Sequence, residues 1–168
     1  ANAAAAFSIV RLLGIDDAVT KQVLDAFSGL VHRLEFVREF GGVRVYNDSK
    51  ATSPEAAMTS MSAFESPVIV LLGGSDKGGH YDALGEFVAR RTKLAICYGQ
   101  TGPAIRDAIE SAKASGRGGE NRGAASMVCT DLPEAVRQAQ QHAASGDVLL
   151  LSPACASYDQ FVNYELRG

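Results

Sequence analysis

The feature that most constrains the fold is a set of short apolar runs in which polar residues do not alternate with apolar ones. Residues 68–72 read Val-Ile-Val-Leu-Leu, residues 94–98 read Leu-Ala-Ile-Cys-Tyr, and residues 148–151 read Val-Leu-Leu-Leu. A strand with one face in water alternates, whereas a strand that is buried on both faces does not. Segments with helical signals separate these runs. The pattern therefore predicts an α/β fold, in which helices cover both faces of a mostly parallel sheet.

Capping and turn signals divide the rest of the chain into further elements. Helices are expected over residues 3–13, between the N-cap Asp16 and Gly29, after the N-cap Ser53, around residues 84–88, from Pro103, after the N-cap Asp131, and in helix-like form over residues 158–165. Strands are expected over residues 34–37, 43–46 and 127–129, and a surface loop over residues 115–123. The first two helices precede the first strand, so they are expected to belong to a neighbouring domain.

Composition excludes several classes of protein. With 168 residues, 46% of them hydrophobic, the chain can bury one core and is not a disordered segment. Its formal net charge of −3 offers no electrostatic footprint for nucleic acid, and no apolar run approaches the roughly 20 residues of a membrane helix. Three widely spaced cysteines, Cys97, Cys129 and Cys155, favour a reducing cytosol over a disulfide framework.

Three polar clusters follow predicted strands, where ligands bind in open α/β sheets. They are Asn47–Thr52, the glycine-rich Gly73–Gly79 around Lys77, and Ser152–Ser157. Each also has a purely structural interpretation: a capped turn with a solvated lysine, a flexible loop, and a tight turn that buries Cys155. No histidine is placed to pair with Cys155, so a catalytic cysteine is not expected.

Together the three clusters predict a site for a small, negatively charged substrate. Lys77 with threonine and serine donors would hold carboxylates through charge-assisted hydrogen bonds. Asp48 would instead accept hydrogen bonds from ribose hydroxyls, as acidic residues do in nucleotide-binding folds.

The same strings resemble the Mur ligase family, and within it the ligases that add D-glutamate. The resemblance rests on Asn-Asp-Ser-Lys-Ala-Thr at 47–52, Leu-Gly-Gly at 72–74 with Lys77, and Leu-Leu-Ser-Pro-Ala-Cys-Ala-Ser-Tyr-Asp-Gln-Phe at 150–161. Gly-Leu-Val-His-Arg at 29–33 and Asn-Tyr-Glu-Leu-Arg-Gly at 163–168 extend it through nearly the whole chain.

This resemblance implies a domain organisation and a reaction. Residues 1–31 would be the last helices of a central ATPase domain, and residues 32–168 a Rossmann-like, amino-acid-binding C-terminal domain without its last helix. The family uses ATP and Mg²⁺ to join D-glutamate to UDP-N-acetylmuramoyl-L-alanine through an acyl phosphate, in peptidoglycan biosynthesis. The chain would then be an inactive piece of a monomeric enzyme of the bacterial cytoplasm, with no nucleic-acid or membrane partner.

The resemblance also assigns roles to individual residues. Thr52 and Lys77 would hold one carboxylate of D-glutamate, and Ser157 with the backbone near Tyr164 would hold the other. The residues expected near ATP are Asp48 at the ribose, Arg33 and Lys50 at the ribose or phosphates, and Asn2 near the adenine. The resemblance implies no catalytic proton-transfer residue and no metal ligand in this part of the enzyme.

Two alternatives stay open. One is a related Mur or folylpolyglutamate-type ligase that adds another amino acid. The other is a stand-alone binding module built on the same fold.

Overall fold

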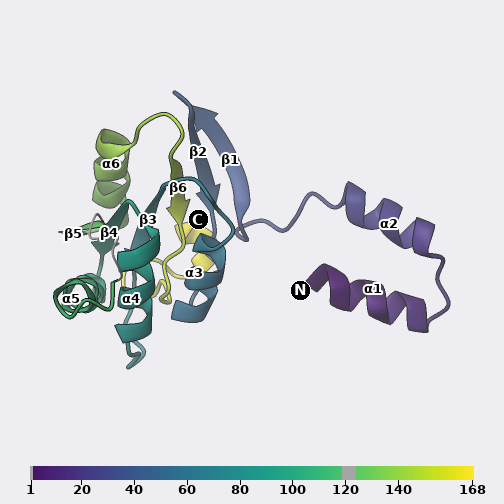
Figure 1. The fold of residues 1–168 in the computed structure, drawn as a ribbon, viewed down its shortest axis with the longest axis horizontal. Coiled ribbons are helices and arrows are strands. Elements are labelled where there is room, and N and C mark those ends of the chain that lie inside the picture. Colours follow the sequence, from purple (N-terminus) through teal and green to yellow (C-terminus); the bar gives the residue numbers. More distant parts are fainter. Residues whose placement is uncertain (1, 119–123) are drawn as a thin grey trace.

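The computed structural model, which describes residues 2–118 and 124–168, contains a six-stranded sheet in the order β1-β2-β6-β3-β4-β5 (Figure 1). The strands are β1 (Glu35–Phe40), β2 (Val43–Asn47), β3 (Val68–Gly73), β4 (Leu94–Tyr98), β5 (Ala125–Cys129) and β6 (Val148–Leu151). All neighbouring pairs are parallel except the β1–β2 hairpin at one edge. The predicted α/β class with a mostly parallel sheet is therefore confirmed.

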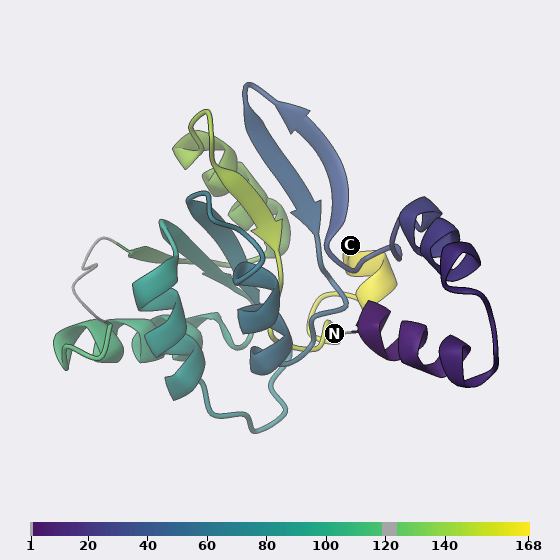
Figure 2. The ribbon, with the colours of Figure 1, turned by 45° about the vertical axis from the view of Figure 1, so that its right-hand side comes forward.

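Helices cover both faces of this sheet. The helices are α1 (Asn2–Leu12), α2 (Asp17–Ala26), α3 (Pro54–Met61), α4 (Asp82–Arg91), α5 (Gly102–Ala114), α6 (Leu132–His142) and α7 (Tyr164–Arg167). Figures 1 and 2 show α3, α4 and α5 on one face and α6 on the other. None of the helices in the described ranges has the length and apolar content to cross a membrane.

The strand β3 shows why its sequence does not alternate. Val68, Val70 and Leu72 belong to the core beneath α3, α4 and α5, whereas Ile69 and Leu71 belong to the core beneath α6. Successive side chains of a strand point to opposite faces, so a strand between two cores must be apolar at every position. All of β3 is buried as a result.

The predicted helix starts agree with the structure. The Asp16 carboxylate accepts a hydrogen bond from the amide of Ala18 at 2.7 Å, and Asp131 accepts one from the amide of Glu134 at 2.8 Å. Ser53 caps α3 in the same way, with Pro54 at the first helical position. These side chains satisfy amides that have no partner within the helix.

Two of the predicted helices differ from the helices in the structure. The helix after Asp16 ends at Ala26, three residues before Gly29. The helix predicted over residues 158–165 is wrong for most of its length, since residues 158–160 form a turn and only α7 is helical. The Asn163 side chain explains the late start, because it accepts a hydrogen bond from the amide of Leu166 at 2.8 Å and so fixes the N-cap.

The first two helices stand apart from the sheet (Figures 1 and 2). They pack against each other, and α2 leads through an extended segment into β1. Apolar side chains on both helices are exposed, among them Leu12 at 88% and Val23 at 64%.

The predicted surface loop at 115–123 is described in part. Residues 115–118 form turns, and residues 119–123 lie outside the described ranges.

Candidate functional site

The three polar clusters meet at one edge of the sheet. Strands β2, β6 and β3 are neighbours and run in parallel, with Asn47 beside Leu151 and Leu151 beside Leu71. Their carboxyl ends therefore open in the same direction, as the sequence predicted. The loops after β3 and β6 are also joined directly, because the amide of Ser75 donates to the carbonyl of Ala156 at 2.9 Å.

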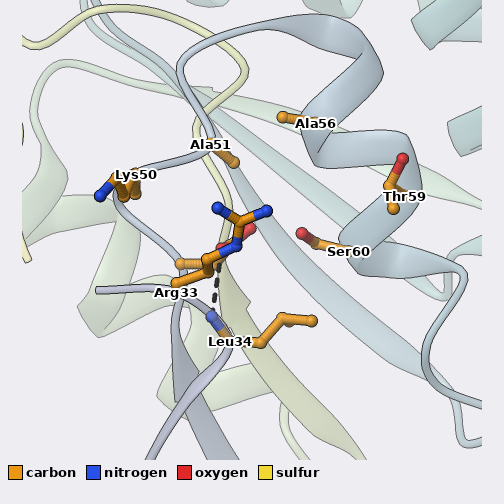
Figure 3. A pocket seen from close by; sticks show the side chains of 8 residues that line it. Arg33, Leu34, Lys50, Ala51, Ala56, Thr59 and Ser60 are labelled. Atoms are coloured by element: carbon orange, nitrogen blue, oxygen red, sulfur yellow. Dashed lines mark hydrogen bonds between the residues drawn. The ribbon is translucent and has the colours of Figure 1, made fainter. Parts of the chain in front are cut away.

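A first pocket, here called the Asp48 pocket, has a volume of about 270 Å³. Its lining residues are Arg33, Leu34, Asp48, Lys50, Ala51, Ala56, Thr59 and Ser60. Figure 3 shows Arg33 reaching into it from the segment before β1, with Thr59 and Ser60 of α3 on the opposite side. The structure thus brings together three residues that were predicted to lie near ATP: Arg33, Asp48 and Lys50.

Asp48 has a second role that the sequence did not predict. The side chain is 97% buried, and its Oδ1 accepts a hydrogen bond from the amide of Leu34 at 3.1 Å while its Oδ2 accepts one from Ser152 Oγ at 2.8 Å. Leu34 and its neighbour His32 both have positive φ, which is unfavourable for residues with a Cβ. Asp48 therefore ties this strained segment to the end of β6, and each carboxylate oxygen keeps further lone pairs for a ligand.

Lys50 points away from α3 in this pocket (Figure 3). Its Nζ lies 5.7 Å from the centre of the Tyr164 ring, which is a cation–π contact. The backbone of Tyr164 is engaged as well, since Ser49 Oγ donates to its carbonyl at 2.6 Å. Lys50 and Tyr164, predicted to serve different ligands, are thus in contact with each other.

A second pocket, here called the Lys77 pocket, is smaller, at about 200 Å³. Its lining residues are Thr52, Ser53, Pro54, Ser75, Lys77, Gly79, Tyr81, Ala154, Cys155 and Ala156. It brings Thr52 and Lys77 together, as the sequence predicted. It adjoins the Asp48 pocket along the chain, because Ala51 lines one and Thr52 the other.

Two residues that line the Lys77 pocket, Tyr81 and Cys155, form a hydrogen-bonded group with Thr101. Cys155 Sγ lies 3.3 Å from Thr101 Oγ1 and 3.5 Å from Tyr81 Oη. Burial raises the pKa of the Cys155 thiol, and burial together with the contact to Cys155 raises the pKa of Tyr81. The thiol is therefore protonated at neutral pH, which agrees with a packing role rather than a nucleophilic one.

Ser157 and Asn2 are the remaining predicted site residues. Ser157 is buried directly after Ala156, and its carbonyl accepts hydrogen bonds from the amides of Gln160 and Phe161. Asn2 begins α1, which stands apart from the sheet (Figure 1). The geometry therefore groups Thr52 with Lys77, and Arg33 with Asp48 and Lys50. Ser157 lines neither pocket, and the side chain of Asn2 lies outside what the structure describes.

Sequence reasoning missed Arg167, which is 95% buried beside the site. Its guanidinium donates to Ser49 Oγ at 3.0 Å, to the Ser49 carbonyl at 2.8 Å and to the Cys155 carbonyl at 2.9 Å. Burial lowers the pKa of this group. A residue of α7 thus holds the loops after β2 and β6 together, and a lone arginine near the end of a polar string gives no local signal of this role.

The fold and the site define an α/β domain in which two adjoining pockets with cationic residues lie at the carboxyl ends of a mostly parallel sheet. The family described as "Mur ligase, glutamate ligase domain" matches residues 32–155. The chain belongs to this family.

Curated relatives extend the match beyond these residues. The UDP-N-acetylmuramoylalanine–D-glutamate ligase of Caldicellulosiruptor bescii is 43% identical over 167 residues, which is 99% of this chain and 35% of the relative. The ligase of the same name from Bacillus cytotoxicus is 44% identical over 168 residues, again 99% of this chain and 35% of the relative. The chain thus spans about a third of the length of these relatives.

Solved structures share the fold at low sequence identity. FolC of E. coli, solved in complex with DHPP and ADP, has a TM-score of 0.61 and 20% identity, and the match covers 91% of this chain and 36% of that one. MurF of Acinetobacter baumannii has a TM-score of 0.58 and 16% identity, with 91% of this chain and 34% of that one covered. At such identities the likeness concerns the fold alone.

Proposed function

We propose that this chain is the amino-acid-binding part of an ATP-dependent ligase that joins D-glutamate to UDP-N-acetylmuramoyl-L-alanine. The observation that carries the proposal is the pairing of Thr52 and Lys77 in one small pocket that adjoins a second pocket with Arg33 and Asp48. The names of the relatives that are about 43% identical support the same reaction.

Each pocket suits one of the proposed ligands. The Lys77 pocket, at about 200 Å³, is smaller than typical sites for drug-sized ligands, and it offers an ammonium group and hydroxyls to a carboxylate. The Asp48 pocket offers a carboxylate for ribose hydroxyls and the Arg33 guanidinium for phosphate. In this proposal Ser157 and the Tyr164 backbone bind the second carboxylate of D-glutamate, Lys50 lies near the nucleotide, and Asn2 lies near the adenine.

The proposed reaction brings two substrates, the activated UDP-N-acetylmuramoyl-L-alanine and D-glutamate, into contact. ATP transfers its terminal phosphoryl group to the carboxylate of UDP-N-acetylmuramoyl-L-alanine, and ADP leaves. The amine of D-glutamate then attacks the acyl carbon and loses a proton to solvent, and inorganic phosphate leaves as the amide forms. Lys77 and Thr52 would hold the amino acid so that its amine faces the acyl phosphate. Correct placement of reacting groups near contact distance lowers a barrier by several kcal/mol. No residue of the chain is required to transfer a proton.

The proposal includes the domain division inferred from the sequence. Residues 1–31 would end a central ATP-binding domain, which would also hold Mg²⁺, and residues 32–168 would form the amino-acid-binding domain. The isolated chain would be inactive, and the whole enzyme would be a monomer of the bacterial cytoplasm. The exposed apolar side chains of α1 and α2 support this division, because such surfaces are normally covered.

A turnover assay on the full-length enzyme tests the proposal. Sustained ADP release over many turnovers should require both UDP-N-acetylmuramoyl-L-alanine and D-glutamate. Lys77→Ala should raise the KM for D-glutamate at least about 10-fold, since a charge-assisted hydrogen bond is lost. Lys21→Ala removes an exposed lysine of α2 and should leave that KM unchanged.

A panel of amino acids separates the alternatives. Turnover with a non-acidic amino acid, and none with D-glutamate, would identify a different ligase. An enzyme that binds D-glutamate or ATP without turnover under any combination would instead be a binding module.

A further inference from the structure

Ser75 is the residue of the Lys77 pocket whose hydroxyl is both buried and without a hydrogen-bond partner among the described residues. Among the residues that the structure describes, only two buried side-chain polar atoms lack a hydrogen-bond partner, Ser75 Oγ and Tyr98 Oη. Tyr98 belongs to the core beneath α6 and does not line the Lys77 pocket. A buried hydroxyl without a hydrogen-bond partner destabilises the folded protein. A ligand that supplies an acceptor for Ser75 Oγ would remove this cost.

The backbone fixes Ser75 in this position. Its amide donates to the carbonyl of Ala156, and the preceding Gly74, at φ +145°, lies so close to that carbonyl that a Cβ would come within 2.0 Å of its oxygen. After Ser75 the loop is held by the amide of Asp76, which donates to Gln100 Oε1 at 3.1 Å. The backbone of Ser75, a residue that lines the pocket, is therefore anchored on both sides.

The other polar groups that line the pocket fall into two kinds. Ser53 Oγ caps α3, and Tyr81 and Cys155 are bonded to each other, so these groups already have partners. Within the described ranges, the side chains of Thr52 and Lys77 have no hydrogen bond or ion pair in the protein, and Ser75 Oγ shares this property. The groups left free in one pocket of about 200 Å³ are thus two hydroxyls and an ammonium.

We infer that Ser75 donates a hydrogen bond to the carboxylate of the incoming amino acid that Lys77 neutralises, and so contributes to selection of an acidic amino acid. This inference rests on the proposed function. A carboxylate accepts about four hydrogen bonds, so it can satisfy Thr52, Ser75 and Lys77 at once. A carboxamide in its place carries no charge for Lys77, and it presents a polar NH₂ to groups that donate.

The variant Ser75→Ala separates this role from a structural one. In the full-length enzyme, the KM for D-glutamate should rise about 10-fold or more with kcat little changed, because a bond to a charged ligand group is lost. The melting temperature without ligand should not fall, because Oγ has no partner to lose. Ser75→Thr keeps the hydroxyl and should restore most of the affinity. Ser62→Ala, at an exposed serine of the α3 C-cap, is the matched control.

A second measurement does not depend on turnover. D-Glutamate should raise the melting temperature of the wild-type enzyme in a thermal-shift titration, and Ser75→Ala should move the midpoint of that titration to about 10-fold higher concentration. An unchanged KM and midpoint in Ser75→Ala, with a responsive wild-type enzyme, would overturn the inference alone. A wild-type enzyme that responds to D-glutamate in neither assay would overturn the proposed function, and the inference with it.

Discussion

Arg167 and Ser49 are joined by two hydrogen bonds, one from Nε to the serine hydroxyl and one from the guanidinium to the serine carbonyl. Ser49 Oγ in turn donates to the carbonyl of Tyr164, one turn of α7 away from Arg167. A closed set of bonds therefore links α7 to the loop after β2, which contains Asp48, Lys50 and Thr52. The third bond of Arg167, to the Cys155 carbonyl, includes the loop after β6 in the same unit.

The first prediction concerns this arginine. Arg167→Ala should lower the free energy of unfolding by about 3 kcal/mol, because buried carbonyls of Ser49 and Cys155 lose their donor at a cost of roughly 1–3 kcal/mol each. Urea denaturation of the chain measures the change. Arg137→Ala removes an arginine from the exposed face of α6 and should change stability by less than about 0.5 kcal/mol. Equal stability of the two variants would contradict the prediction.

Asp48 gives a second prediction, because two elements depend on its carboxylate. Asp48→Ala leaves the Leu34 amide and the Ser152 hydroxyl without an acceptor and should lower the free energy of unfolding by about 2–4 kcal/mol. Asp48→Asn keeps one carbonyl acceptor and should cost less than half as much. Urea denaturation compares the two, and hydrogen exchange at the Leu34 amide should become faster in Asp48→Ala. A Leu34 amide that stays protected in Asp48→Ala would show that its hydrogen bond to Asp48 does not stabilise this segment.

The third prediction compares two glycines of the loop after β3. A Cβ on Gly74 would come within 2.0 Å of the Ala156 carbonyl oxygen, whereas a Cβ on Gly78 would meet nothing within 4 Å. Both glycines have positive φ, so both Ala variants carry backbone strain of about 1–2 kcal/mol, but only Gly74→Ala also forces the loops apart. Gly74→Ala should therefore be destabilised by at least about 2 kcal/mol more than Gly78→Ala in urea denaturation. The Ser75 amide should also lose protection from hydrogen exchange only in Gly74→Ala.

Local signals in the sequence predicted the fold well, and contacts between distant residues were the part that they did not predict. The apolar run 68–72 and the N-caps Ser53 and Asp131 were identified correctly, because burial on both faces and capping leave their mark within a few residues. The rule that parallel strand ends meet at one edge predicted that the polar clusters would gather, and the resemblance to the Mur ligases implied the pairing of Thr52 with Lys77. By contrast, Arg167 reaches Ser49 across 118 positions of sequence, and no spacing rule applies to such a pair.

The structural role of Asp48 was missed for a related reason. An acidic residue after a strand suggests a ribose ligand, but its bonds to Leu34 and Ser152 come from segments 14 and 104 residues away. Ser75 was included only as a member of the glycine-rich cluster Gly73–Gly79, since a serine among glycines is also typical of a flexible loop. Its relevance became visible only when the partners of every group in the pocket could be compared.

The last prediction concerns stability at alkaline pH. Cys97 lies on β4 and is completely buried in the core that includes α5, and this burial raises the pKa of its thiol from 9.0 to about 12. In the unfolded chain the thiol ionises near its ordinary value. Between these two values the unfolded state binds fewer protons than the folded state, so the free energy of unfolding falls as the pH rises. The slope from this group alone is about 1.4 kcal/mol per pH unit above roughly pH 9.

The variant Cys97→Ala isolates this contribution, because other buried groups titrate in the same direction. Burial also raises the pKa of Tyr98 and of Cys129, so wild-type stability should fall on the alkaline side even without Cys97. Urea denaturation under reducing conditions at pH 8 and at pH 10.5 should show a decline at least about 1 kcal/mol larger for the wild type than for Cys97→Ala. The cavity left by the substitution lowers stability at both pH values equally and does not affect this difference. Parallel declines in the two proteins would mean that the Cys97 thiol does not resist ionisation in the folded state.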